Sequence, residues 1–193
     1  MDIDAGTFVD LPPGTVTQVA RYRYKVFVQM LGWKLATQGG LELDQFDRAD
    51  TIYIVARNDD GQVIGSARLL PTTRPYLLSE IFPQLLGGAR LPCSAKVWEL
   101  SRFAAVDFNE RRTSALSQFS SSSVAVGLLQ VAIRTAAERG AERLITVSPI
   151  GIERLLRKAG FQAHRAGPPV VVDGHPLFAC YIECESEPVL EPI

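Results

Sequence analysis

The sequence predicts an α+β fold around a mixed sheet, and three features of the chain support this prediction. A segment with helical spacing comes first, an antiparallel hairpin follows it, and helices alternate with strands towards the end of the chain. Helices and antiparallel strands in separate parts of a chain are typical of the α+β class. The 193 residues, 47% of them hydrophobic, suffice for one domain with a sizeable core.

The N-terminal part is expected to hold helix and loop. Residues 7–11 have the composition of a short strand, which a Pro-Pro-Gly sequence ends. A helix is predicted over residues 16–28, with Thr15 or Thr17 as its cap, because apolar residues recur there at helical spacing. Glycines and acids interrupt residues 28–50, where we expect a short helix followed by a long loop.

The sheet is expected to begin with a hairpin. Residues 51–57 and 62–70 are apolar segments that flank Asn58-Asp59-Asp60-Gly61, a strong turn signal. A short helix is predicted at 79–86 and a strand at 97–106. The remaining predictions are helices at 123–139 and 151–159, and strands at 144–147, 162–165 and 177–183.

The charge balance gives no reason to expect nucleic acid or a membrane as a partner. Twenty basic and 21 acidic residues give a net charge of -1, so attraction to nucleic acid or anionic lipid is not expected. No apolar run approaches the ~18 residues that span a bilayer. The N-terminus is acidic and lacks the basic head and apolar block of a signal peptide. We therefore expect a cytoplasmic protein.

The cysteines and histidines do not suggest a metal site. Cys93, Cys180 and Cys184 are odd in number, and they have no metal-ligand spacing with His164 and His175. We expect each cysteine to act as a small buried hydrophobe. Neither a metal nor a disulfide framework is predicted.

The strand at 97–106 carries two charges among apolar neighbours. Strict alternation places Glu99 on one face and Arg102 on the other, so the two are not expected to pair with each other. Arg68, on a neighbouring predicted strand, is likewise a charge among apolar neighbours. Buried charges need a partner or a function, so each of these residues is a candidate for a site.

Further charges and aromatics precede the sheet. Arg23 lies one helical turn before Phe27, Trp33 follows, and Asp44 and Asp47 lie three residues apart. Aspartate binds ammonium, arginine forks onto carboxylate, and aromatic faces attract a sulfonium. Taken singly, each residue also has a plainer interpretation as a surface charge or a core aromatic. Together they suit a substrate with an ammonium, a carboxylate and an aromatic or sulfonium group.

Two resemblances extend this interpretation. The element order resembles the GNAT acyltransferase fold, which implies a three-layer α/β/α sandwich with a mixed, mostly antiparallel central sheet. Five segments resemble the acyl-homoserine-lactone synthases, the bacterial enzymes that make quorum-sensing autoinducers; they are residues 21–33, 42–57, 65–83, 97–105 and 164–174. This resemblance implies a single domain over 1–193, with an S-adenosylmethionine-binding part at about 15–50 and a sheet and acyl-binding part at about 51–184.

The resemblance implies a reaction between two substrates. These are S-adenosylmethionine and an acyl group on acyl carrier protein; no separate cofactor is expected. The methionine amine would attack the acyl thioester, and lactone closure would then release methylthioadenosine. The family's characteristic charged and aromatic positions fall on Arg23, Phe27, Trp33, Asp44, Asp47, Arg68, Glu99 and Arg102.

Roles for these residues follow from that chemistry. Glu99 is the candidate base, because a partly desolvated carboxylate is a better base than an exposed one. Asp44 and Asp47 are expected to hold the ammonium. The three arginines are expected to anchor the carboxylate or to pair with the acids. The aromatic side chains expected beside S-adenosylmethionine are Phe27, Trp33 and Phe103.

Two further sets of residues are candidates for contact with the acyl donor. An acyl pocket is predicted from Leu100, Phe103, Val126, Leu129, Thr146, Ser148 and Ile152. The residues expected to contact the acidic carrier protein are Arg111, Arg112, Arg154, Arg157 and Lys158. Some members of the family that take 3-oxo acyl groups carry threonine in the region where this chain has Val147, Ser148 and Pro149. From this resemblance we expect an unsubstituted acyl chain of medium length.

Two other functions fit parts of the sequence. One is a GNAT-type N-acyltransferase that uses acyl-CoA and another amine. Residues 107–127 lack the Gln/Arg-x-x-Gly-x-Gly/Ala loop that grips the CoA pyrophosphate in such enzymes, which disfavours this alternative. The other is a non-catalytic domain that binds S-adenosylmethionine or acyl carrier protein as a sensor.

Overall fold

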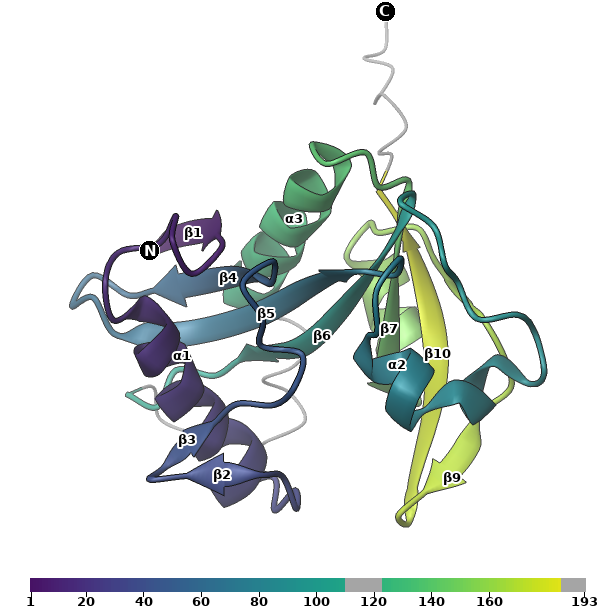
Figure 1. The fold of residues 1–193 in the computed structure, drawn as a ribbon, viewed down its shortest axis with the longest axis horizontal. Coiled ribbons are helices and arrows are strands. Elements are labelled where there is room, and N and C mark those ends of the chain that lie inside the picture. The colour runs from purple at the N-terminus through teal and green to yellow at the C-terminus, as the bar shows by residue number, and fades with distance from the viewer. Residues whose placement is uncertain (110–122, 185–193) are drawn as a thin grey trace, which may run out of the picture. The chain divides into compact units, whose positions relative to one another are not determined.

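The computed structural model describes residues 1–109 and 123–184, and within them the chain divides into two compact units (Figure 1). The first unit comprises Met1–Leu70 and Leu100–Ala132, and the second comprises Pro71–Glu99 and Ile133–Ile193. Strand β6 (Val97–Ala105) therefore begins in the second unit and ends in the first.

The first unit has an antiparallel edge and a helical segment. Its strands follow the order β1-β4-β5-β6, and β4 pairs antiparallel with both β1 and β5 (Figure 1). A small hairpin of β2 and β3 follows the helical segment. The bounds are β1 Asp2–Gly6, α1 Thr15–Arg23, the π-helix η1 Tyr24–Met30, β2 Thr37–Gln38, β3 Leu41–Glu42, β4 Ile52–Arg57 and β5 Val63–Pro71.

The second unit contains the parallel pairing of the sheet. Its strands follow the order β6-β7-β10-β8, with β9 also paired to β10. The start of β6 is parallel to β7, whereas β10 is antiparallel to β7, β8 and β9. The bounds are α2 Leu77–Ile81, the 3-10 helix η2 Pro83–Leu86, β7 Arg143–Pro149, α4 Ile152–Lys158, β8 Ala163–Arg165, β9 Val170–Val172 and β10 His175–Glu183. Helix α3 (Ser123–Ala137) begins in the first unit and ends in the second.

Most predicted elements are confirmed. The hairpin forms as β4 and β5, and all later predicted helices and strands are present with ends shifted by a few residues. The predicted helix at 79–86 is divided in two, because Pro83 begins a separate 3-10 helix. Strand β9 was not predicted.

The N-terminal predictions were wrong in three details. Residues 7–11 form a turn, because the Asp10 carboxylate accepts hydrogen bonds from the amide and hydroxyl of Thr7, and the strand lies before it as β1. Neither threonine caps α1. The N-cap is Gly14 in a left-handed conformation, and Thr15 is already helical. Within residues 28–50, all of which the structure describes, the helical segment ends with η1 at Met30 and no separate short helix follows it. The predicted loop contains the short β2–β3 hairpin.

Two apolar clusters hold the first unit together. One combines Tyr22, Val26 and Phe27 of the helical segment with Ala104 and Val106 at the end of β6. The other packs Leu11, Val19, Tyr53 and Val55. The first cluster joins helical residues spaced four and five apart to alternate residues at the end of β6. The second joins α1 to alternate residues of β4.

No helix in the part of the chain that the structure describes is long and apolar enough to cross a membrane. Cys180 and Cys184 are buried as expected, and burial raises the pKa of each thiol to about 11. Cys93 is exposed, which contradicts the prediction that it is a buried hydrophobe.

Candidate active site

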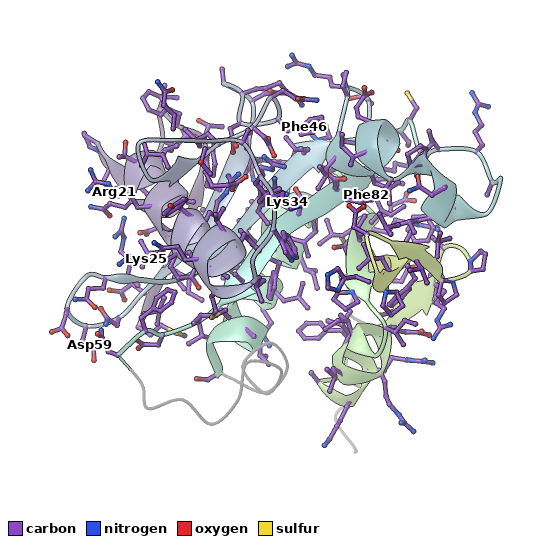
Figure 2. The ribbon with its side chains drawn as sticks, turned by 90° about the horizontal axis from the view of Figure 1, so that it is seen from below. Arg21, Lys25, Lys34, Phe46, Asp59 and Phe82 are labelled. Atoms are coloured by element: carbon purple, nitrogen blue, oxygen red, sulfur yellow. The ribbon has the colours of Figure 1, made fainter. Side chains whose placement is uncertain are left out.

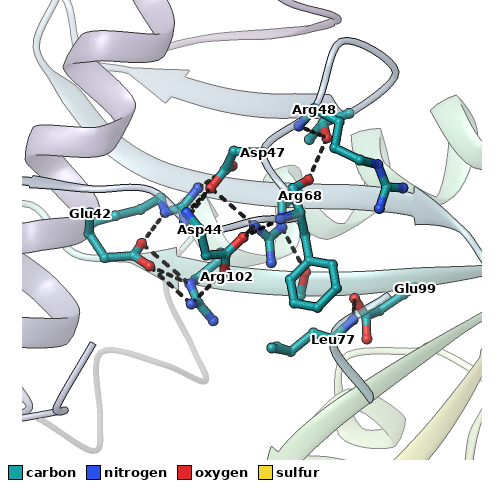
Figure 3. Close-up of polar contacts among 12 residues, drawn as sticks. Glu42, Asp44, Asp47, Arg48, Arg68, Leu77, Glu99 and Arg102 are labelled. Carbon is teal, nitrogen blue, oxygen red and sulfur yellow. Dashed lines mark hydrogen bonds and ion pairs between the residues drawn. The ribbon is translucent and has the colours of Figure 1, made fainter. Parts of the chain in front are cut away.

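Six charged side chains of the first unit meet in a buried ion cluster (Figure 3). Burying charges is costly unless they are paired and hydrogen-bonded. Each member pairs with at least one residue of opposite sign, and three arginines balance three acids. The members of the buried ion cluster are Arg23, Glu42, Asp44, Asp47, Arg68 and Arg102.

Asp47 receives the strongest set of contacts. Arg23 forks onto it, with Nη1 2.7 Å from Oδ1 and Nη2 3.1 Å from Oδ2. Nη1 of Arg68 lies 3.2 Å from Oδ2, and the Tyr53 hydroxyl donates to Oδ1. Burial raises the pKa of the Asp47 carboxyl, but these arginines outweigh it and hold the pKa at about 2. Asp47 is therefore ionised at neutral pH.

Asp44 is the most accessible member of the buried ion cluster, with 16% of its side chain exposed. Its two oxygens accept from Arg68 Nη1 at 2.6 Å and from Arg102 Nη2 at 2.8 Å. Oδ1 also accepts the Phe46 amide two residues later, and this turn fixes the carboxylate direction. The Phe46 ring in turn lies 5.6 Å from the guanidinium carbon of Arg68.

Glu42 is the member that the sequence analysis missed. It is fully buried and bridges two arginines, accepting from Nε of Arg23 and from Nε and Nη2 of Arg102. A signal was present in the sequence. Glu42 lies two residues before Asp44 in the segment that resembles the family, so alternation in an extended chain brings both carboxylates to one side.

Arg102 lies where β6 departs from a regular strand. Its φ of 51° is in the left-handed region, which is uncommon for a residue other than glycine. Ser101 accepts a hydrogen bond from Arg68, and its neighbour Arg102 also contacts the buried ion cluster. Strict alternation would have placed these two side chains on opposite faces. The faces predicted for the strand therefore do not hold beyond Ser101.

An aromatic stack adjoins the buried ion cluster. The rings of Phe27 and Trp33 are stacked, with centroids 5.0 Å apart and planes 21° apart. The guanidinium of Arg102 lies 5.8 Å from the Phe27 ring. Trp33 is 41% exposed, whereas Phe27 is buried. The stack thus offers a solvent-accessible aromatic group next to buried charges.

The π-helix η1 supplies Phe27 and leads into Trp33. The amide of Leu31 donates to Val26, and that of Trp33 donates to Phe27, so the turns here are wider than in an α-helix. Such wide turns are frequent at functional sites. Figure 2 shows Arg21 and Lys25 on the outer side of the helical segment, where both are exposed. Arg23 between them is buried, because it occupies the inward face.

Glu99 belongs to the second unit and has other partners. It is 1% exposed, and its two oxygens accept from the backbone amides of Leu77 and Leu78 at 3.1 and 2.6 Å. These donors fix the position of the carboxylate. No local pattern in the sequence predicts this contact with α2.

The predicted acyl-pocket residues are divided between the units. In the first unit Leu100 and Leu129 are buried, and Phe103 and Val126 are half-buried. In the second unit Thr146 and Ser148 are buried on one face of β7. Ile152, at the start of α4, is half-buried. The acyl pocket itself stays a prediction.

The predicted carrier-protein contacts are partly outside the described residues, because Arg111 and Arg112 lie in 110–122. Arg154, Arg157 and Lys158 are exposed on α4. Arg157 pairs with Glu153 at 2.7 Å, which reduces the charge that it presents.

Among residues 1–109 and 123–184, no three or more histidine, cysteine or acidic side chains are placed to hold a metal ion. The three acids of the buried ion cluster are held by arginines instead.

Comparisons with known proteins identify the family. Residues 11–191 match the family described as Autoinducer synthase. The chain belongs to the autoinducer synthase family. An acyl-homoserine-lactone synthase of Acinetobacter nosocomialis is 57% identical over 183 residues, covering 95% of this chain and all of the relative. The expectations of this family and of an acyltransferase enzyme are confirmed.

Solved structures place the autoinducer synthase within a wider fold. TofI, solved with an inhibitor and MTA, is 43% identical with a TM-score of 0.80, covering 96% of this chain and 92% of its own. BjaI, described as CoA-dependent and solved with SAM and isopentyl-CoA, is 27% identical with a TM-score of 0.80, covering 95% and 83%. An acyl-CoA N-acyltransferase from Pseudomonas aeruginosa, 17% identical with a TM-score of 0.59 and coverage of 93% and 97%, shares the fold alone. The α+β, GNAT-like fold class is confirmed.

Proposed function

We propose that this autoinducer synthase makes an acyl-homoserine lactone from S-adenosylmethionine and an acyl group carried by acyl carrier protein. The observation that carries the proposal is the buried ion cluster with its adjoining aromatic stack, in a chain of this family. S-adenosylmethionine presents an ammonium, a carboxylate and a sulfonium, and these are the groups that acids, arginines and aromatic rings recognise. TofI was solved with MTA and BjaI with SAM.

The buried ion cluster divides between framework and binding. Arg23 and Glu42 are almost fully buried and pair within the cluster, so they fix its shape. Asp44 is the most exposed member and receives the ammonium, with Asp47 beside it. Arg102, whose side chain is 7% exposed, is placed at the carboxylate.

The sulfonium and adenosine lie by aromatic side chains in this proposal. Trp33 exposes part of its ring, and Phe27 stacks beneath it. An aromatic face stabilises a sulfonium cation through its quadrupole. Phe103, half-buried in β6, completes the set.

The first chemical step is acyl transfer. Glu99 takes a proton from the ammonium, directly or through one water, and the freed amine attacks the thioester carbonyl. A carbon–nitrogen bond forms and the carbon–sulfur bond breaks, so the carrier leaves as a thiol after gaining a proton. In the second step a carboxylate oxygen attacks the carbon that bears the sulfonium. Methylthioadenosine then leaves, and positioning is the main requirement.

The acyl donor distinguishes two versions of the proposal. Carrier protein is favoured by the exposed basic residues of α4, since the carrier is acidic, and by the absence of a pyrophosphate-binding sequence in residues 107–127. Acyl-CoA is the second candidate, because BjaI is described as CoA-dependent.

The test is turnover by the purified protein with S-adenosylmethionine and one acyl chain, supplied either on carrier protein or on CoA. Mass spectrometry of the product is expected to detect the acyl-homoserine lactone, with the carrier-protein donor giving the lower KM. A lower KM for acyl-CoA would reverse the donor assignment. If the protein binds S-adenosylmethionine but forms no product with either donor, the result would favour the non-catalytic sensor over the enzyme.

The role of Glu99 has its own test. Glu99→Gln is expected to lower kcat by ~10²–10⁴, the usual contribution of a general base, while S-adenosylmethionine binding persists. Binding is measured by calorimetry and kcat from lactone formation. Unchanged turnover would remove Glu99 from the base role without affecting the proposed reaction.

A further inference from the structure

The contact between Glu99 and α2 joins the proposed base to a defined piece of backbone. Glu99 Oε1 accepts the Leu78 amide at 2.6 Å, and Oε2 accepts the Leu77 amide at 3.1 Å. The carboxylate is 1% exposed, so these bonds are formed away from water. Two donors on two oxygens fix both the position and the plane of a carboxylate.

The segment that supplies these amides is itself held in place. Tyr76, directly before α2, is 2% exposed, and its hydroxyl donates to the Pro92 carbonyl at 2.7 Å. Thr72 donates to the Ser94 and Val97 carbonyls and accepts the Ser94 amide. These contacts bind residues 72–79 to the segment that leads into β6, and all of them lie within the second unit.

We propose that the start of α2, at Leu77 and Leu78, is the positioning element of the proposed general base. Its amides hold the Glu99 carboxylate in a fixed position and orientation, and Tyr76 anchors the segment that carries those amides. The inference rests on the proposed function, because it assumes that Glu99 accepts a proton from substrate. It assigns a role in catalysis to backbone groups outside the buried ion cluster and the aromatic stack.

Leu77 allows one of these donors to be removed selectively. It is the first residue of α2, a position where proline is well tolerated because its missing N–H serves no helical bond. Tyr76 before it is extended, with φ of -138° and ψ of 164°, which is the conformation that a following proline requires. Leu77→Pro therefore removes a hydrogen bond to Glu99 and leaves the glutamate in place. Leu77→Ala is the matched control, since it loses the side chain and keeps the amide.

Steady-state kinetics of both variants provide the first test. We expect kcat of Leu77→Pro to be ~10-fold or more lower than that of Leu77→Ala, because the reacting group loses its position. KM for S-adenosylmethionine should change little. Equal kcat in the two variants would overturn the inference. So would an equal loss of kcat in both variants that accompanies a lower melting temperature.

A second measurement tests the inference even if the Leu77→Pro variant fails to fold. In the ¹⁵N-labelled wild type, the Leu78 amide proton is expected at low field because of its short bond to a carboxylate, and it should move upfield in Glu99→Gln. An unmoved Leu78 resonance would overturn the inference. Failure of the proposed function can be distinguished from failure of this inference. If the proposed function is wrong, neither the wild type nor Leu77→Ala forms lactone, but the Leu78 resonance still reports the contact with Glu99.

Discussion

At the scale of single residues, the buried ion cluster depends on carboxylates that each contact two arginines. Glu42 bridges Arg23 and Arg102, and Asp44 bridges Arg68 and Arg102. Removing one partner of a buried pair leaves the other charge uncompensated, which costs more than the pair contributes as a whole. The cluster therefore acts as one unit, and the stability of the cluster depends on its framework members as well as on those proposed to contact substrate.

Glu42→Gln tests this dependence. The change leaves two buried arginines short of one negative charge, and we expect the free energy of unfolding to fall by ~3–5 kcal/mol, with loss of lactone formation. Urea denaturation measures the change, and Glu138→Gln on an exposed position is the control. A stability loss equal to that of Glu138→Gln would contradict the framework role.

The lowered pKa of Asp47 implies that the stability of the protein depends on pH. Its folded-state pKa of about 2 lies below the ~3.9 of an unfolded aspartate, so its ion pairs stabilise the protein above that unfolded value. This contribution is lost as the pH falls through the folded value. Stability of the wild type should therefore decline from about pH 4 to pH 2, and Asp47→Asn should show a shallower decline. Urea titrations across this window measure both slopes; equal slopes would contradict the assignment.

At the scale of elements, Tyr22 joins the helical segment to two strands. Its buried hydroxyl donates to the Ile64 carbonyl of β5 at 3.0 Å and accepts the Val106 amide, just after β6, at 2.8 Å. Burial raises the pKa of this hydroxyl, so it stays protonated as a donor. The helix that carries Arg23 is thus fixed to the strands that carry Arg68 and Arg102.

Tyr22→Phe is expected to leave two buried backbone groups without this partner and to lower the free energy of unfolding by ~1–3 kcal/mol. Tyr24→Phe, at a half-buried position on the same helical segment, is the matched control. Denaturant unfolding measures both. If the two variants lose the same stability, the hydroxyl of Tyr22 does not bridge the strands.

At the scale of the whole molecule, charge is nearly balanced but unevenly distributed. The net charge is -1, yet α4 presents Arg154, Arg157 and Lys158 to solvent. Because Glu153 pairs with Arg157, Arg154 is the better place to test attraction of an acidic carrier protein. This surface is a property of the exposed helix and is independent of the buried ion cluster.

Arg154→Glu is expected to raise KM for the acylated carrier protein several-fold at low salt, and added salt should reduce the difference. KM for S-adenosylmethionine should not change. Arg134→Glu, an exposed position on α3, is the control. Equal effects of the two substitutions would argue against α4 as the contact surface.

The sequence by itself determined the order of most elements and most members of the site. The β4–β5 hairpin follows from a four-residue turn between apolar segments, and α1 follows from helical spacing; both signals are local, so they can be recognised without a structure. The charged and aromatic positions of the cluster and stack, except Glu42, were recognised from family resemblance. The local signals failed at residues 7–11, where a single Asp10 side chain closed a turn.

Only the tertiary structure decided how those residues combine. Glu42 and Arg102 are 60 positions apart, and Glu99 lies 21 positions from the Leu78 amide, so no local pattern reports their contacts. The left-handed backbone at Arg102 has no sequence signature in a residue other than glycine, yet it brings Ser101 and Arg102 to the same cluster. Periodicity reports which face of an element is buried, whereas the pairing of buried charges depends on how distant elements are brought together.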